Sequence, residues 1–205
     1  MEKDRSTEEK IKQAARKIFH QKGYAAARTR DIAEEAGINL ALLNYYFRSK
    51  EKLFEMVMAE SLKEMLHPVM VILNDPATSL SSKIDQVMDA YVDILSGNPN
   101  LPIFILGEMK AHPERLPQRM GLENSFMKQT VFYFQLDSHL KKINLDEADP
   151  MQYMVNMLSL IVFPFVASPL LRTIGGLSDD DFQQMVEERR VCVPVWVKNM
   201  IQLTD

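Results

Sequence analysis

The amino-acid sequence predicts an all-α protein. Residue types that favour helices, such as Leu, Ala, Met, Glu, Lys and Gln, dominate the chain. Few segments alternate apolar and polar residues in the manner of a strand. Residues 1–67 contain no proline and only two glycines. The length of 205 residues fits two domains, which we expect at residues 1–54 and 55–205.

The first predicted helix runs from about Thr7 to Lys22. Ser6 and Glu9 have the spacing of a capping box, which satisfies free amides at a helix start. Gly23 stands where a left-handed C-terminal cap is needed. The apolar residues of this helix repeat at helical spacing and predict one buried stripe: Ile11, Ala14, Ala15, Ile18 and Phe19.

Two short helices should follow, separated by a tight turn at Gly37. The second helix fits Thr29 to Ala36, with Thr29 as its cap, and Asn39 can cap a third helix that reaches Tyr46. Two short helices joined by a glycine turn are typical of a helix-turn-helix. The residues expected to face the core of this N-terminal three-helix domain are Ile32, Ala33, Ala36, Ile38, Leu42 and Phe47.

The outer face of the third helix is the candidate DNA contact, because the second helix of a helix-turn-helix enters the major groove. Leu40 and Ala41 could touch thymine methyls, and Asn44 could pair with a base edge or a phosphate. Tyr45 and Tyr46 offer hydroxyls to phosphates. Ser49 should cap a fourth helix of roughly eighteen residues, ended soon after by Pro68, with Lys50 adding positive charge in its first turn.

Residues 6–54, with "TRDIAEEAGINLALLNYYFRSKEKLF" at their centre, resemble the DNA-binding domain of the TetR family of bacterial transcriptional regulators. The shared pattern is T-x-x-x-I-A, a turn glycine, Y-[YH]-F and S-K-E-x-L-F. The resemblance implies that Thr29 and Lys50 hold phosphates, that Arg30 reaches a base and that Asn44 and Tyr45 contact the backbone. Many members have tyrosine in place of Asn44, so base readout by Asn44 stays open. The DNA-contact candidates are Arg28, Thr29, Arg30, Asn39, Leu40, Ala41, Asn44, Tyr45, Tyr46 and Lys50.

Charge is divided unevenly along the chain. Residues 1–53 hold 12 Lys+Arg and 8 Asp+Glu, a net +4, whereas residues 54–205 hold 12 and 20, a net −8. A basic N-terminal part on an acidic body indicates that the N-terminal part meets an anion such as double-stranded DNA.

The remaining helices are predicted from apolar spacing and from breaks at proline and glycine. We expect the last helix to be capped by Ser178 and to end near Met200. The other expected helices cover residues 80–95, 103–111, 117–142 and 151–174.

The middle helices carry many methionine and aromatic residues. These residues suit a pocket for varied ligands, but they also suit an ordinary core. The family resemblance implies a small-molecule pocket in this part of the chain. The candidates are Phe104, Met109, Phe126, Met127, Phe134, Met154 and Met157.

The last two predicted helices have more apolar surface than one subunit can cover. Residues 151–171 are uncharged, but Gln152, Asn156 and two prolines favour a buried interface helix over a membrane span. Paired with their symmetry mates, the two helices would form a four-helix dimer interface, as the resemblance also implies. The interface candidates are Phe163, Leu170, Met185, Cys192, Trp196 and Met200.

The sequence contains no Ser-His-Asp order, phosphate loop or dinucleotide fingerprint, so we expect no enzyme and no cofactor. Glu108 and His112 could share a metal, but no third ligand has a diagnostic spacing. A single cysteine and a charged N-terminus favour the cytoplasm. The expected function is a homodimeric repressor released from a palindromic operator by an unknown small-molecule inducer. The alternatives are a DNA-binding regulator without an inducer, and a helical interaction protein with a vestigial DNA-binding module.

Overall fold

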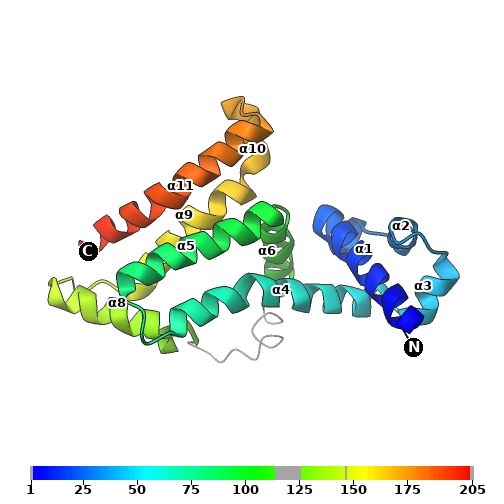
Figure 1. The fold of residues 1–205 in the computed structure, drawn as a ribbon, viewed down its shortest axis with the longest axis horizontal. Helices are drawn as coiled ribbons and strands as arrows, with labels where there is room; N and C mark the ends of the chain where they lie inside the picture. Colours follow the sequence, from blue (N-terminus) through cyan, green and yellow to red (C-terminus); the bar gives the residue numbers. More distant parts are fainter. Residues whose placement is uncertain (1, 114–125, 146, 204–205) are drawn as a thin grey trace. The chain divides into compact units, whose positions relative to one another are not determined.

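The computed structural model describes residues 2–113, 126–145 and 147–203, and every regular element in these ranges is a helix (Figure 1). The all-α prediction is therefore confirmed. The elements are α1 (Glu2–Ala26), α2 (Thr29–Glu35), α3 (Leu40–Tyr46), α4 (Lys50–Asn74), α5 (Leu80–Gly97), α6 (Leu101–Ala111), the short 3₁₀ helix η1 (Phe126–Gln129), α8 (Val131–Lys142), α9 (Pro150–Val166), α10 (Ser168–Gly175) and α11 (Asp179–Met200).

The chain separates into two compact units. The head unit contains the chain up to Lys63 and, in addition, α6 from Ile103 onward. The body unit contains Glu64–Pro102 and the described residues after 122. Helix α4 therefore belongs partly to each unit, and the boundary lies between its residues 63 and 64.

Aromatic side chains from three helices form the core of the head unit. Phe19 of α1 is fully buried and meets Phe54 of α4 edge to face, with 5.1 Å between ring centroids. Phe104 of α6 packs against the same Phe54 ring at 5.6 Å and against His20 at 4.5 Å. Such edge-to-face pairs add about 0.5–1.5 kcal/mol beyond the burial of their area. The predicted apolar stripe of α1 is buried throughout: Ile11, Ala14, Ala15, Ile18 and Phe19.

The first helix differs from its prediction at both ends. Helix α1 starts at Glu2, so Ser6 and Glu9 lie inside it and do not form its start. At Gly23 the backbone leaves the helix with φ 69° and ψ 175°, a region that is essentially open only to glycine. The expected glycine stop is therefore present, but its ψ angle is extended and is not that of a left-handed cap.

Two predictions about the helix-turn-helix are wrong in detail. Arg28, and not Thr29, occupies the cap position of α2, and no side chain caps this helix. In α3, Leu43 is buried while Leu42 is exposed. Because α3 begins at Leu40, a shift of one position turns the helix by about 100° and exchanges the two leucines.

The body helices are broken in different places from those expected. Helix α4 continues through Pro68 to Asn74. In the described part of residues 117–142, Thr130 ends η1 and caps α8 by accepting a hydrogen bond from the Tyr133 amide (3.2 Å). The expected helix 151–174 is two helices, α9 and α10, bent by 66°, because Pro169 lies at the start of α10 and cannot continue a helical hydrogen-bond ladder.

Helix α11 lies against α5 and α9 (Figure 1), and two of its arginines contact these helices. Arg190 contacts Asp89 and Asp93 at 3.2 and 2.8 Å, and Arg189 donates a hydrogen bond to the Leu160 carbonyl of α9 (2.6 Å). The predicted start of α11 is confirmed, since Ser178 forms a capping box with Asp181. In the described ranges no single helix is long and apolar enough to cross a membrane, although the bent pair of α9 and α10 together reaches that length and composition.

Candidate DNA-binding surface and ligand cavity

Backbone hydrogen bonds and one side-chain cap stabilise the turn between α2 and α3. Gly37 adopts φ 66°, which favours glycine, and the Ile38 amide donates to the Ala33 carbonyl (3.0 Å). The Asn39 side chain accepts a hydrogen bond from the Leu42 amide (2.8 Å), so Asn39 caps α3 as predicted. This cap fixes the direction in which α3 leaves the turn.

Leu43 and Phe47 anchor α3, and the opposite side of the helix is exposed. Leu43 is 1% exposed and Phe47 is 7% exposed. Five of the residues that the sequence assigned to DNA are exposed on α3 and its cap, together with Leu42: Asn39, Leu40, Ala41, Asn44 and Tyr45. Tyr45 is 76% exposed and stands edge to face with the half-buried Tyr46, 5.4 Å away. The arrangement offers two apolar groups, an amide and a phenol on one short helix.

The start of α2 adds basic groups to the head unit. Arg28 and Arg30 are exposed, and Thr29 between them is half-buried at the first position of α2. Two of the three acidic residues of α2 are bound by lysines of α1, with Asp31 2.8 Å from Lys22 and Glu35 2.7 Å from Lys17. The hydrogen bond from Lys22 lowers the pKa of Asp31. These pairings offset the acidic charge beside the two arginines.

Lys50 makes a structural contact that was not predicted from the sequence. Its ammonium group donates a hydrogen bond to the Tyr24 carbonyl (2.5 Å) and lies 4.3 Å from the centre of the Tyr24 ring. Ser49 caps α4 as predicted, by accepting from the Lys52 amide (3.1 Å). Lys50 therefore joins the start of α4 to the residues that follow the break in α1.

The body unit contains an apolar cavity of about 210 Å³ between α4, α5, η1 and α9. Four of its lining residues are methionines, Met127, Met151, Met154 and Met157, and a fifth is Tyr91. The other lining residues are aliphatic: Val69, Leu73, Val87, Val155 and Leu158. None of the ten carries a charge. Burial raises the pKa of the Tyr91 phenol to about 12, so this hydroxyl stays protonated at neutral pH.

The pocket candidates named from the sequence are dispersed in the structure. Met127, Met154 and Met157 line the cavity. Phe104 is in the core of the head unit, Met109 is exposed on α6, and Phe126 is half-buried in η1. The sequence reading missed Tyr91 and Met151. Tyr91 lies on the buried side of the amphipathic α5 and Met151 near the start of the strongly apolar α9, so no local signal separates them from core residues.

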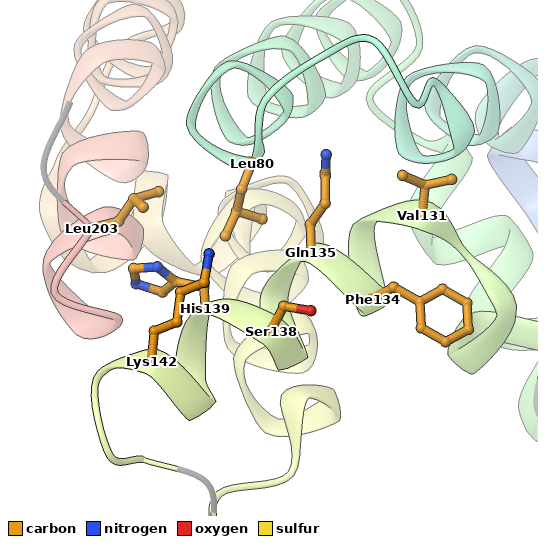
Figure 2. A pocket seen from close by; sticks show the side chains of 8 residues that line it. All are labelled: Leu80, Val131, Phe134, Gln135, Ser138, His139, Lys142 and Leu203. Atoms are coloured by element: carbon orange, nitrogen blue, oxygen red, sulfur yellow. The ribbon is translucent and has the colours of Figure 1, made fainter.

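Phe134 lines a different hollow, an open groove of about 460 Å³ beside α8 (Figure 2). Two of its polar residues are already engaged with the backbone: His139 with the Ile201 carbonyl (2.7 Å) and Gln135 with the Thr78 carbonyl (2.9 Å). Figure 2 shows the Phe134 ring turned away from the His139 end of this groove. The remaining lining residues are Leu80, Val131, Ser138, Lys142 and Leu203.

The dimer candidates lie on α9, α10 and α11. Phe163, Leu170, Trp196 and Met200 are exposed, while Met185 and Cys192 are half-buried. Met185, Cys192, Trp196 and Met200 follow one another at intervals of seven, four and four residues and so share one side of α11. The sequence reading missed further exposed apolar residues on α10 and α11: Ile174, Val191 and Val195. Within the described ranges no three His, Cys, Asp or Glu side chains form a possible metal site.

Comparisons with known proteins agree with this geometry. Residues 11–57 match the family described as bacterial regulatory proteins, tetR family. A protein of Bacillus subtilis (strain 168) named "Probable HTH-type transcriptional regulator YttP" is 23% identical over 208 residues, which cover 98% of this chain and 96% of that protein.

Two solved structures share the fold over most of their length. The TetR family transcriptional regulator PfmR from Thermus thermophilus is 19% identical, with a TM-score of 0.62 and coverage of 90% of this chain and 97% of PfmR. HlyIIR, a hemolysin II transcriptional regulator, is 20% identical, with a TM-score of 0.56 and coverage of 90% and 97%. At these identities the likeness concerns the fold alone.

Proposed function

We propose that this chain, which is a transcriptional regulator of the TetR family and not an enzyme, is a homodimeric repressor released from a palindromic operator by a small molecule. The observation that carries the DNA-binding part is the exposed side of α3. Its polar and apolar groups stand clear of the head core, while Leu43 and Phe47 hold the helix from behind. The same chain would work in the cytoplasm, where its DNA target lies.

The first residues of α3 would read the operator in the major groove. Leu40 and Ala41 suit thymine methyls, and the Asn44 amide suits an adenine edge. Tyr45, Thr29 and Arg28 would bind phosphates and set the register of the helix. Arg30, which is exposed in the first turn of α2, would add a base contact.

The exposed apolar residues of α9, α10 and α11 support a dimer. Phe163 is 61% exposed and Ile174 is 77% exposed. This exposure of apolar surface to water is unfavourable, and a second copy of the same surface would remove it. Small polar residues of α9, Asn156 and Ser159, stand beside Phe163 at helical spacing and permit close helix approach. A two-fold dimer would place two recognition helices about 34–36 Å apart, one turn of DNA.

Helix α4 supports coupling between the cavity and the DNA-binding surface. Its Leu53 and Phe54 belong to the head core, and its Val69 and Leu73 line the cavity of the body unit. A ligand that fits the cavity better in one position of α4 than in another would shift the population of DNA-competent dimers. The shift can be no larger than the difference in ligand affinity between the two forms.

The test is a binding titration against the DNA that flanks the protein's own gene, at two salt concentrations, with random DNA as control. Tight binding to one stretch that weakens steeply with salt supports the proposal. Weak binding to all fragments with little salt dependence would instead favour an interaction protein. Arg30→Ala and Asn44→Ala should relax preference at individual base pairs by roughly 1–3 kcal/mol. Lys63→Ala, an exposed lysine of α4, is the matched control that should leave the preference intact.

A further inference from the structure

We infer that the cavity between α4, α5, η1 and α9 takes a small, uncharged aromatic compound with at most one hydrogen-bonding group. The inference rests on the proposed function in one respect, since it names the chemical class of the inducer. Three features of the cavity support it: its size, its apolar lining and the one tyrosine among its lining residues.

The size of the cavity limits the ligand to a small molecule. Pockets for drug-sized ligands occupy roughly 300–1,000 Å³, and this cavity holds about 210 Å³. An apolar cavity of about 150 Å³ in another protein stays dry and binds benzene. The present cavity therefore has room for a benzene ring with a substituent, and not for a drug-sized ligand.

The lining excludes a charged ligand. Its side chains include no acid, no base and no amide. A carboxylate or ammonium placed there would lose its water and gain no opposite charge, which costs more than the apolar contacts return. The ligand must therefore be neutral at the pH at which it acts.

The methionines favour an aromatic ring over an alkyl chain. Met127, Met151, Met154 and Met157 come from η1 and α9 and reach the cavity with flexible thioether side chains. Thioether sulfur makes favourable contacts with ring edges, worth about 0.3–1.5 kcal/mol each, and an alkyl chain gains no such term. Pliable side chains also let the cavity close on rings with different substituents.

Tyr91 supplies the only polar group of the lining. Its side chain is 5% exposed, and it lies on α5 opposite the methionines of α9. Among the described residues, no hydrogen bond joins the phenol to another group. A protonated phenol can donate to a ligand oxygen or accept from a ligand hydroxyl. One hydroxyl or carbonyl on the ligand is thus accommodated. Val155 and Leu158 are about half exposed and mark the side from which a ligand would enter.

The experiment is NMR of full-length protein carrying ¹³C-methyl methionine, titrated with four probes of similar size. Toluene and 4-methylphenol are neutral rings, 4-methylbenzoate is a charged ring and 1-hexanol is a neutral chain. We expect the two neutral rings to shift the methyl signals of the four lining methionines, assigned by single Met→Leu substitutions. 4-Methylbenzoate should bind at least about tenfold more weakly, and 1-hexanol should bind more weakly than 4-methylphenol.

Two variants test the position of the ligand. Tyr91→Phe should weaken 4-methylphenol by roughly threefold to tenfold and leave toluene unchanged. Val155→Trp should fill the entrance and abolish binding of both rings, whereas Val71→Trp, at an exposed site of α4 outside the lining, should not. Stronger binding of 4-methylbenzoate or 1-hexanol than of the neutral rings would overturn the inference, as would unchanged binding in Val155→Trp.

Operator titrations in the presence of 4-methylphenol separate this inference from the proposed function. Shifted methionine signals with unchanged operator affinity would uphold the ligand class and refute the inducer role. If a charged or aliphatic probe releases the protein from the operator, that result would uphold the inducer role and refute the inferred ligand class.

Discussion

The Lys50 ammonium group donates a hydrogen bond to the Tyr24 carbonyl at 2.5 Å and stands 4.3 Å from the centre of the Tyr24 ring. Tyr24 follows Gly23, where the backbone of α1 leaves the helix, and Lys50 is the first residue of α4. The contact therefore connects two chain segments that flank the helix-turn-helix. Its position indicates a structural role for Lys50 in addition to any contact with phosphate.

Lys50→Met should accordingly lower the stability of the DNA-free protein and its affinity for DNA. A hydrogen bond to a charged donor and an exposed cation–π contact together predict a loss of about 1–2 kcal/mol in the free energy of unfolding. Urea unfolding measures this loss. Lys52→Met removes a neighbouring exposed lysine and should leave the urea midpoint nearly unchanged. Equal midpoints for the two variants would show that the Tyr24 contact adds nothing to stability.

The prediction of α3 shows what sequence spacing can decide and what it cannot. The glycine turn, the Asn39 cap and the exposed Asn44 and Tyr45 could be predicted, because turn and cap chemistry is local. The choice between Leu42 and Leu43 as the buried leucine could not, because two adjacent apolar residues fit a short helix equally well. Only the position of the α3 start relative to the head core decides between them.

The helix breaks and the cavity of the body unit could not be predicted from the sequence, because both depend on how the helices pack. Breaks such as the 66° bend after α9 depend on which of several prolines the packing tolerates: Pro164 stays inside α9, while Pro169 begins α10. The cavity is lined by the same residue types as the core. Tyr91 and Met151 therefore could not be distinguished from core residues without the positions of α5 and α9 in space.

Tyr45 should contribute to DNA binding and little to folding. Its side chain is 76% exposed, so Tyr45→Ala should change the free energy of unfolding by no more than about 0.5 kcal/mol. The same change should weaken binding to all DNA sequences alike, as expected for a phosphate contact. Fluorescence anisotropy with operator and random DNA provides the measurement. A loss of preference confined to one base pair would assign Tyr45 to base readout instead.

Phe163→Glu should break the dimer. The side chain is 61% exposed in one chain, and a carboxylate in its place would have to be buried without a partner if two copies met there. Sedimentation equilibrium at low micromolar concentration should show a monomer for this variant. Val71→Glu places the same charge at an exposed apolar site of α4 and should leave the dimer intact. A dimeric Phe163→Glu protein would move the interface away from this side of α9.

The capping box of α11 predicts a pH-dependent stability. The Ser178 hydroxyl and the Ser178 amide both donate to the Asp181 carboxylate, the amide at 2.9 Å, and these bonds hold the Asp181 pKa below its ordinary value of 3.8. A depressed folded-state pKa gives stability that is fully present above the unfolded value and is lost as the pH falls through the folded value. Asp181→Asn should therefore lower the urea midpoint at pH 7 and have a shrinking effect below about pH 4. Asp180→Asn, one position away and outside the capping box, is the matched control and should lower the urea midpoint at pH 7 by less than Asp181→Asn.

Pro68→Ala tests whether α4 carries the response between the units. Pro68 lies inside α4, has no amide to donate to the helical ladder and stands five residues beyond the boundary after Lys63. Alanine at this exposed position should stiffen α4 and raise the free energy of unfolding, by up to about 3 kcal/mol. If α4 must change shape when the cavity is filled, the variant should still bind ligand but should show a smaller change in operator affinity on saturation. Pro194→Ala, in a helix that lies wholly in the body unit, should retain the full change. A Pro68→Ala protein that is more stable and responds to ligand as the wild type does would exclude bending of α4 at Pro68 as the route of coupling.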